Sequence, residues 1–251
     1  MVAALVAPSM ALATRNLLAT PMAGAYVCIS VLAAVALALL QWLPAQAASP
    51  VSSQASAPVT RQALWQRAPL RYALCLTACG QGLMVLLMNA TPLAMQHHGH
   101  ALAVSAQVIQ WHVLGMFAPS LVAGPALDRF GARPVAWAGV LCLGASAATA
   151  LLGGAQLPFL LSSMLLGIGW NLVILAGTTM LGQAYAPAEK ATAQSMMEWS
   201  NGAMATLMSF GSGALIQTLG WSAINWAVFP VLACMVWWLS RRAALVRPAA
   251  V

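Results

Sequence analysis

The residues most able to do chemistry in this chain are polar side chains that interrupt long apolar segments. Glu198 is one of three acidic residues, with Asp128 and Glu189, and it alone falls inside an apolar segment. A carboxylate in hydrocarbon is costly, so such a residue normally faces protein or water and takes part in ion or proton movement. The alternative is that Glu198 lies near a membrane surface and only orients its helix. The sequence favours neither interpretation.

His112 lies in the middle of another apolar segment. A neutral imidazole can hydrogen-bond a solute or pass a proton near physiological pH, but a helix-to-helix hydrogen bond fits it equally well. Other polar residues of the apolar segments could line a common midplane cavity, although each one alone is more typical of interhelical packing. These cavity candidates are Asn89, Gln107, Gln110, Trp170, Asn171, Thr178 and Asn201.

The segment GPALDRFGARP joins two apolar stretches and concentrates charge and glycine. Gly124 at its start would let neighbouring helices approach closely. Asp128 and Arg129 would end the apolar stretch with charges at the membrane surface. Gly131 permits a tight reversal of the backbone, and Arg133 would anchor the next stretch at the same surface.

The composition excludes a water-soluble protein. Hydrophobic residues make up 62% of the 251 residues and charged residues 5%, whereas a soluble domain carries about 25% charged residues. The mean hydropathy of +0.85 equally excludes a disordered chain. The net charge of +7 comes from basic residues scattered between apolar stretches, so we expect no nucleic-acid partner.

The sequence offers no catalytic centre. It contains no nucleophile motif, phosphate loop or metal-ligand pattern, so we expect neither an enzyme nor a cofactor. The five cysteines lie in apolar segments and are odd in number, which argues against a disulfide framework or a metal site. The cluster His97, His98 and His100 has no acid or cysteine nearby and is interpreted as a solvated loop.

Apolar runs predict about eight transmembrane helices, because a spanning helix needs roughly 20 apolar residues. The runs, of which the first is the weakest, cover residues 2–18, 24–43, 70–93, 104–127, 135–152, 157–181, 193–219 and 221–239. They are continuous and do not alternate apolar with polar residues as barrel strands do. The predicted fold class is therefore all-α, a polytopic transmembrane helical bundle.

Basic residues predict how the chain is oriented. Residues 44–69 are rich in Ser, Pro and Gln and are interpreted as a flexible linker that ends in a basic stretch. If this linker is cytoplasmic, alternating spans place residues 128–134, 185–192 and 240–251 on the same side. Every Lys and Arg except Arg15 then lies in the cytoplasm, as the positive-inside rule requires. We expect a multi-pass protein of the plasma membrane, the inner membrane of a bacterium, with both termini cytoplasmic.

One alternative concerns the start of the chain. Residues 24–43 are followed by Ala45, Gln46 and Ala47, which resembles a signal peptide with its cleavage site. The apolar run is longer than the roughly 7–15 residues usual for such peptides. Cleavage would also leave the following arginines on the wrong side of the membrane, so we favour a spanning helix.

The segment GPALDRFGARP resembles the signature loop of the major facilitator superfamily, the twelve-helix secondary transporters. In that family the loop follows the second helix of each six-helix half, and here it follows the fourth predicted span, with four more after it. The resemblance implies that residues 1–43 are the last two helices of the N-terminal half and residues 44–69 the cytoplasmic linker. Residues 70–240 would then form the complete C-terminal half and residues 241–251 a basic cytoplasmic tail. The resemblance thus implies that the family's first four helices have no counterpart in these 251 residues.

The resemblance also implies a function: a permease that moves a small solute by alternating access, with the proton gradient as driving force. Its partners would be the lipid bilayer, the solute and protons, and the full-length protein would be a monomer. In the family the acid of the loop is implicated in a cytoplasmic gate against the N-terminal end of a helix from the other half, where the helix dipole favours a carboxylate. For Asp128 that helix would be residues 2–18.

The missing helices favour a second hypothesis, a truncated membrane protein that does not transport. It would be a remnant of the fold, or an assembly factor that binds a partner, because half of the cavity wall is absent. An in-frame continuation of about four spans upstream of Met1 would distinguish the two.

Overall fold

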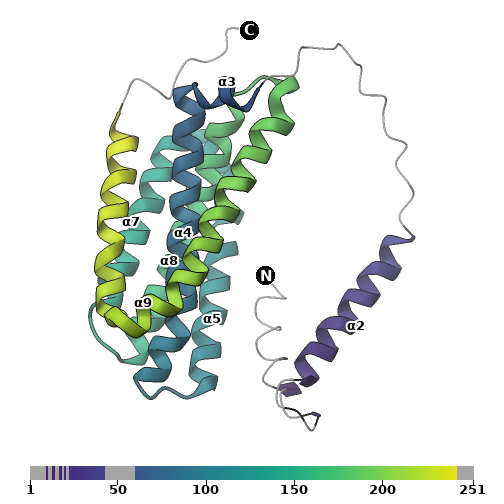
Figure 1. The fold of residues 1–251 in the computed structure, drawn as a ribbon, viewed down its shortest axis with the longest axis vertical. Helices are drawn as coiled ribbons and strands as arrows, with labels where there is room; N and C mark the ends of the chain where they lie inside the picture. The colour runs from purple at the N-terminus through teal and green to yellow at the C-terminus, as the bar shows by residue number, and fades with distance from the viewer. Residues whose placement is uncertain are drawn as a thin grey trace. The chain divides into compact units, whose positions relative to one another are not determined.

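The computed structural model describes residues 23–42 and 60–241, with a few single positions between residues 10 and 20 (Figure 1). Apart from Met1, the chain divides into two units, Val2–Pro58 and Val59–Val251. The first unit contributes helix α2 (Ala23–Leu40). Several predictions fall outside the described residues: most of the span 2–18 with Arg15, the resemblance to a cleavage site, most of the linker, and the basic tail from residue 242.

The second unit is built from helices, and the described residues contain no strand. In chain order its elements are α3 (Arg61–Trp65), α4 (Ala68–His97), α5 (Leu102–Phe117), α6 (Ser120–Phe130), α7 (Ala132–Ala150), α8 (Gln156–Gly182), the 3-10 turn η1 (Pro187–Glu189) and α9 (Lys190–Ser240). Helices α2, α4, α8 and α9 are each long and apolar enough to cross a membrane. The predicted all-α membrane bundle is therefore confirmed.

Helix α9 contains two predicted spans joined by a sharp reversal. Gly220 has φ 78° and ψ 173°, a left-handed conformation that glycine adopts without a steric penalty. The chain therefore runs the length of the bundle and then returns toward the end from which it started (Figure 1). Directly after the reversal, the Trp221 indole N–H donates to the carbonyl of Ala150 at the end of α7, 3.1 Å away. The turn predicted at Gly220 is confirmed.

The span predicted over residues 104–127 is wrong as a single helix. The chain breaks at Ala118 and Pro119, and α5 and α6 lie on either side. Proline has no N–H to continue the ladder of hydrogen bonds, and its ring crowds the preceding turn. The last bond before the break runs from the Ala118 amide to the carbonyl of Leu114 (2.8 Å).

The end of the predicted linker is ordered into a helix. Helix α3 begins after Thr60, whose hydroxyl accepts a hydrogen bond from the amide of Ala63 (3.3 Å) and so caps the first turn. Leu64 is fully buried and joins the core of the bundle. The short helix packs on α4 and α9, so the chain reaches α4 along a defined path.

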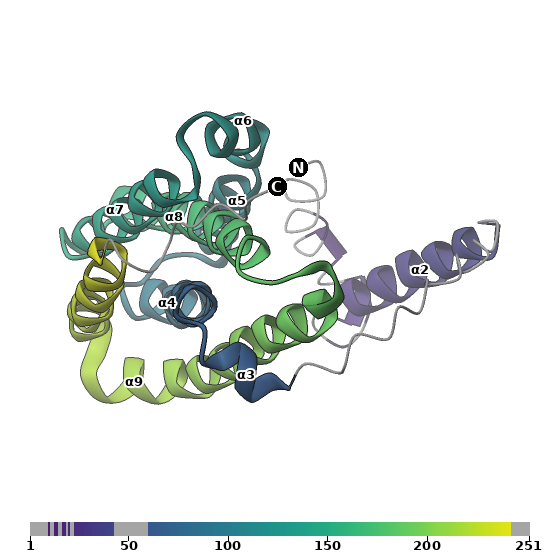
Figure 2. The ribbon, with the colours of Figure 1, turned by 90° about the horizontal axis from the view of Figure 1, so that it is seen from above.

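Helix α8 is central to the packing: α7, α5 and α4 all lie against it, and α9 packs mainly on α4 (Figure 2). Glycines let the backbones meet. A Cβ atom on Gly167 would lie 2.4 Å from the carbonyl oxygen of His112 on α5, and one on Gly139 of α7 would lie 2.9 Å from the carbonyl oxygen of Gly169. Close approach of this kind replaces the hydrophobic effect as the source of helix association in lipid.

Polar contacts define two ends of the bundle. At one end the Arg133 guanidinium, at the start of α7, donates to the carbonyl of Leu239 at the end of α9 (2.9 and 2.5 Å). At the other end the His98 and His100 rings stand edge-on to Phe159 with centroids 5.7 Å apart, so these histidines pack rather than being only solvated. The described arginine-bearing connections share the first end, as the predicted orientation requires. The side of the membrane that this end faces stays a prediction.

Candidate functional site

The predicted signature loop joins α6 to α7. Gly131 turns the chain with φ 81° and ψ 168°, which fits the reversal predicted there. Asp128 and Arg129 are exposed; the Arg129 guanidinium lies over the Phe130 ring, 5.3 Å from its centroid. Asp128 has no hydrogen-bond partner among the described residues. Its expected partner, the N-terminal end of the predicted helix 2–18, lies outside them, so the gate stays a prediction.

Gly124 and Arg133, near the two ends of the loop, make contacts that differ from those predicted. The predicted close approach at Gly124 is not made within residues 60–241, because a Cβ atom there would meet nothing within 4 Å. Arg133 does more than anchor a span at the membrane surface: its bonds to the Leu239 carbonyl tie the start of α7 to the end of α9.

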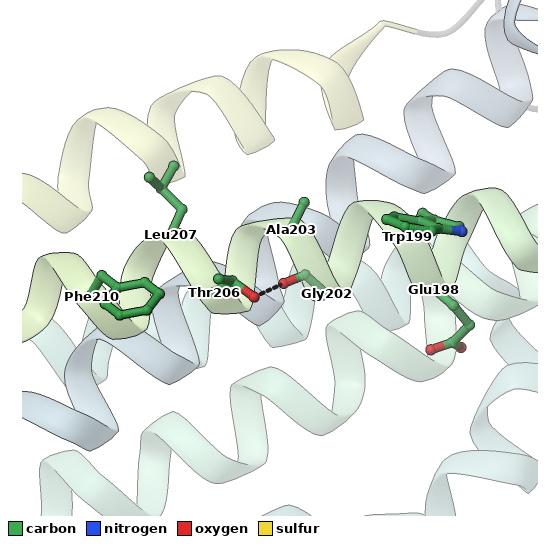
Figure 3. Close-up of a pocket in the computed structure, with 7 residues that line it drawn as sticks. All are labelled: Glu198, Trp199, Gly202, Ala203, Thr206, Leu207 and Phe210. Atoms are coloured by element: carbon green, nitrogen blue, oxygen red, sulfur yellow. Dashed lines mark hydrogen bonds between the residues drawn. The ribbon is translucent and has the colours of Figure 1, made fainter.

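Glu198 lies on an exposed face of α9 that carries a shallow hollow (Figure 3). Figure 3 shows Glu198 and Trp199 at one end of the hollow and Phe210 at the other. Between these ends the lining residues are Gly202, Ala203, Thr206 and Leu207. The Thr206 hydroxyl donates back to the carbonyl of Gly202 (2.8 Å). The hollow is therefore an apolar face with one carboxylate at its rim.

A second hollow lies between α4 and α9. It is lined by Val85, Asn89, Ala205, Thr206, Ser209 and Phe210. The Asn89 side-chain amide donates to the hydroxyl of Ser209 (3.1 Å) and bridges the two helices. Thr206 and Phe210 line both hollows, so the two hollows adjoin, and together we call them the α4–α9 groove. Asn89 and Glu198, predicted separately, thus share a surface.

Trp170 adds a polar contact between α8 and α4. Its indole N–H donates to the side-chain oxygen of Gln81, 2.9 Å away. Sequence reasoning missed Gln81. The available signal was a carboxamide inside an apolar span between two glycines, Gly80 and Gly82.

The other cavity candidates do not gather at the groove. Asn171 is buried and donates to the hydroxyl of Ser120 on α6 (2.8 Å). Gln107 accepts a bond from Gln156 at the start of α8 (3.2 Å), and the exposed Thr178 donates to the Ile174 carbonyl of its own helix (2.7 Å). Two further candidates are half-buried, Gln110 and Asn201.

His112 lies inside the seam between α5 and α8. Its side chain is 1% exposed, and Nδ1 lies 2.9 Å from the carbonyl oxygen of Ser163. A carbonyl only accepts, so Nδ1 carries the proton and donates. Nε2 is buried without a hydrogen-bond partner among the described residues. The bond joins α5 to α8. It agrees with the second of the two interpretations of His112, a helix-to-helix hydrogen bond.

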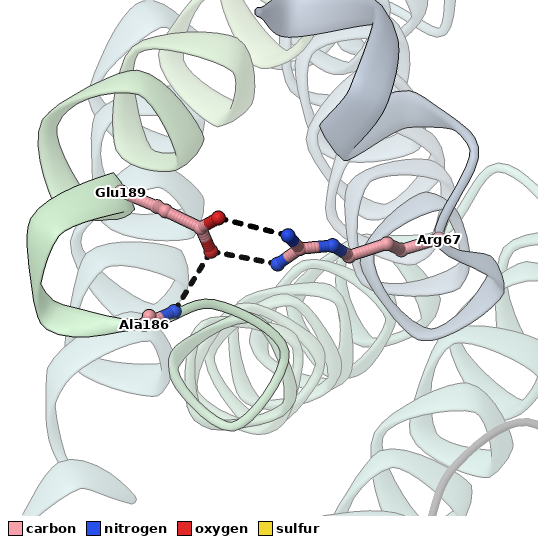
Figure 4. A network of polar contacts seen from close by, with 3 residues as sticks. All are labelled: Arg67, Ala186 and Glu189. Carbon is pink, nitrogen blue, oxygen red and sulfur yellow. Dashed lines mark hydrogen bonds and ion pairs between the residues drawn. The ribbon is translucent and has the colours of Figure 1, made fainter. Parts of the chain in front are cut away.

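An ion pair that the sequence did not predict fixes the arginine-bearing end, outside the predicted spans (Figure 4). The Arg67 guanidinium donates two hydrogen bonds to the Glu189 carboxylate (2.6 and 2.8 Å), and the Ala186 amide donates a third (2.9 Å). The bonds from Arg67 and then from Ala186 lower the pKa of Glu189 below its usual value. The pair joins the start of α4 to the turn before α9.

The chain is similar to known membrane transporters. It is 35% identical to a riboflavin transporter of Brucella anthropi, RfnT, over 94% of this chain and 60% of that protein. Two uncharacterised transporters of Bacillus subtilis are similar over shorter stretches: YdeG is 30% identical over 61% of this chain, and YddS is 29% identical over 64%. They are covered over 37% and 38% of their lengths.

The chain also matches the sequence profile of a protein family, and this match agrees with the relatives. The described residues hold no group of His, Cys, Asp or Glu that could bind a metal ion, and no solved structure matches the chain significantly. The sequence profile of the Major Facilitator Superfamily matches residues 77–250. The chain therefore belongs to the major facilitator superfamily, a family of membrane transporters rather than of enzymes.

Proposed function

We propose that the protein moves a flavin such as riboflavin across the membrane by alternating access. The observation that carries this proposal is the similarity to a riboflavin transporter along 94% of the chain. The α4–α9 groove supports it, because Trp199 and Phe210 expose aromatic faces on which a flat ring system can stack. Asn89 and Ser209 place hydrogen-bonding groups in the same hollow as Phe210.

In this proposal residues 70–240 act as the C-terminal half of the transporter, and the loop with Asp128 closes its cytoplasmic side. Glu198 carries the coupling proton, because its carboxylate opens onto the groove, where solute and water can reach it. His112 is assigned a packing role, since its bonded nitrogen is held by a backbone carbonyl inside a helix seam.

The proposed setting is the inner membrane of a bacterium. The arginine-bearing end faces the cytoplasm, together with both termini, because basic connections are retained on that side. The connections at the opposite end carry His98, His100 and Gly220 and no basic residue of the Lys or Arg type among the described residues. The full-length transporter works as a monomer in lipid.

Uptake of riboflavin into proteoliposomes tests the function. The chain is reconstituted alone, and uptake is measured with and without an imposed pH gradient, against protein-free vesicles and against an unrelated sugar. We expect gradient-stimulated uptake of riboflavin and not of the sugar. Glu198→Gln should abolish the stimulation, and Asp128→Asn should lower the rate while membrane insertion is unchanged.

Transport, the proton carrier and the gate can each be rejected by a separate result. Uptake equal to that of protein-free vesicles would reject transport by this chain and support the hypothesis of a non-transporting protein. Transport that responds to the gradient equally in Glu198→Gln would reject the proton carrier. A rate unaffected by Asp128→Asn would reject the gate.

A further inference from the structure

The carboxamide of Gln81 is held in one orientation by Trp170. An indole N–H is a donor only, so the group that faces it across 2.9 Å must be the oxygen of the carboxamide. The amino group of Gln81 therefore points away from the indole. Among the described residues this amino group has no hydrogen-bond partner.

The position of Gln81 on α4 is set by its two neighbours. A Cβ atom on Gly80 would lie 2.7 Å from Val173 of α8, and one on Gly82 would lie 3.0 Å from Met204 of α9. The two glycines thus let different helices pack against α4. Gln81 lies between these two lines of contact and is half-buried.

The same stripe of α4 leads into the α4–α9 groove. Val85 and Asn89 follow Gln81 at intervals of four residues, so the three lie one above another on the helix. Both of them line the hollow against α9. The backbone of Gln81 therefore lies about 12 Å along the helix axis from that of Asn89, at the rise of 1.5 Å per residue.

We propose that Gln81 determines which solutes bind, by presenting its amino group as an oriented hydrogen-bond donor. It selects solutes that carry a carbonyl oxygen or an unprotonated ring nitrogen, and a flavin ring carries both. The selection is strict because the indole occupies the carboxamide oxygen, so the group cannot turn to accept a bond instead. This inference rests on the proposed function and adds the determinant of its specificity.

Binding of riboflavin to the purified chain in detergent micelles tests the inference, measured by quenching of flavin fluorescence. Gln81→Glu keeps the shape and the acceptor for Trp170 but replaces the donor with oxygen. We expect its Kd to rise at least about tenfold, because an acceptor of the solute then faces an acceptor of the protein. Gln96→Glu makes the same chemical change at an exposed position near the end of α4 and should alter the Kd by less than about twofold.

Trp170→Phe is a second variant that leaves position 81 intact. It removes the indole donor, so the carboxamide of Gln81 can rotate. Affinity should fall by about threefold to fivefold, as expected for one lost orienting hydrogen bond. Combined with Trp170→Phe, Gln81→Glu should then have a smaller effect than it has alone.

The outcomes separate this inference from the function beneath it. If the wild type binds riboflavin and the Kd is unchanged in both Gln81→Glu and Trp170→Phe, the proposed role of Gln81 is overturned. The flavin proposal itself would stand. Absence of riboflavin binding by the wild type would overturn the flavin proposal, and the inference with it. Elution as a single species in size-exclusion chromatography shows that each variant is folded.

Discussion

Glycine residues have opposite effects on packing in two regions of the bundle, the seam of α8 with α5 and α7 and the α4–α9 groove. In the seam of α8 with α5 and α7, glycines bring backbones together: a Cβ atom on Gly167 would meet the His112 carbonyl oxygen at 2.4 Å. On the α4–α9 groove, a Cβ atom on Gly202 would meet nothing within 4 Å. A small residue therefore permits close packing only where another backbone lies within reach, and elsewhere it leaves the surface open.

Polar residues differ between the two surfaces in the same way. In the seam, His112 is bonded to the backbone carbonyl of Ser163. At the groove, Asn89 is bonded to the side chain of Ser209 on a neighbouring helix. A backbone partner cannot move unless its helix moves, whereas a side-chain partner can change rotamer. The comparison indicates a rigid seam and an adaptable groove.

The largest effect should come from adding a methyl group to the seam. Gly167→Ala forces a Cβ atom against backbone atoms that cannot rotate away, at an expected cost of about 3 kcal/mol in the free energy of unfolding. Gly182→Ala, at the end of the same helix, meets nothing within 4 Å and should be neutral or stabilising by up to about 1 kcal/mol. Thermal unfolding in detergent measures both. Equal unfolding midpoints would contradict the rigid seam.

A smaller effect should follow from removing one polar group on each surface. His112→Leu loses a buried hydrogen bond between α5 and α8 and should cost about 1 kcal/mol of stability. Asn89→Leu, in the exposed groove, should change stability by less than about 0.5 kcal/mol. The same unfolding assay compares them. A larger loss at Asn89 than at His112 would reverse the assignment of the two surfaces.

The smallest effect concerns the ion pair at the arginine-bearing end, which is partly exposed. Arg67→Gln should cost less than about 1 kcal/mol at neutral pH. Since the pKa of Glu189 is lowered on folding, the contribution is fully present above about pH 4.5. It should be lost as the pH falls through the pKa of the folded state. Wild type and Arg67→Gln should therefore differ in unfolding midpoint at pH 7 and converge in stronger acid. A constant difference down to the lowest pH would argue against the pair.

Most of the fold could be predicted because the physical signals are local. Apolar runs gave the spans of α4, α7 and α8 to within a few residues, and Gly220 marked the reversal in α9. The break at Ala118 and Pro119 was missed, since apolarity continues across the proline and hides the interruption of the helix.

The candidate site was predicted less completely. Asn89, Glu198 and Trp170 were named, and the structure associates the first two with one groove and the third with Gln81. Gln81 itself was missed, and the partner of Asn171 on α6 was not indicated, because a span that is apolar on every side carries little information about which of its faces meets which neighbouring helix. Polar residues on such helices are identified by type, but their partners are not.

The sequence by itself determined the medium, most of the apolar helices and the charged connections, because these follow from transfer of side chains between water and lipid, residue by residue. Tertiary structure alone decided that His112 is locked in a seam while Glu198 opens onto a groove, and that Trp170 fixes the carboxamide of Gln81. The physical reason is that a hydrogen bond between helices depends on their mutual rotation and distance, and both are set by the packing of residues far apart in the chain.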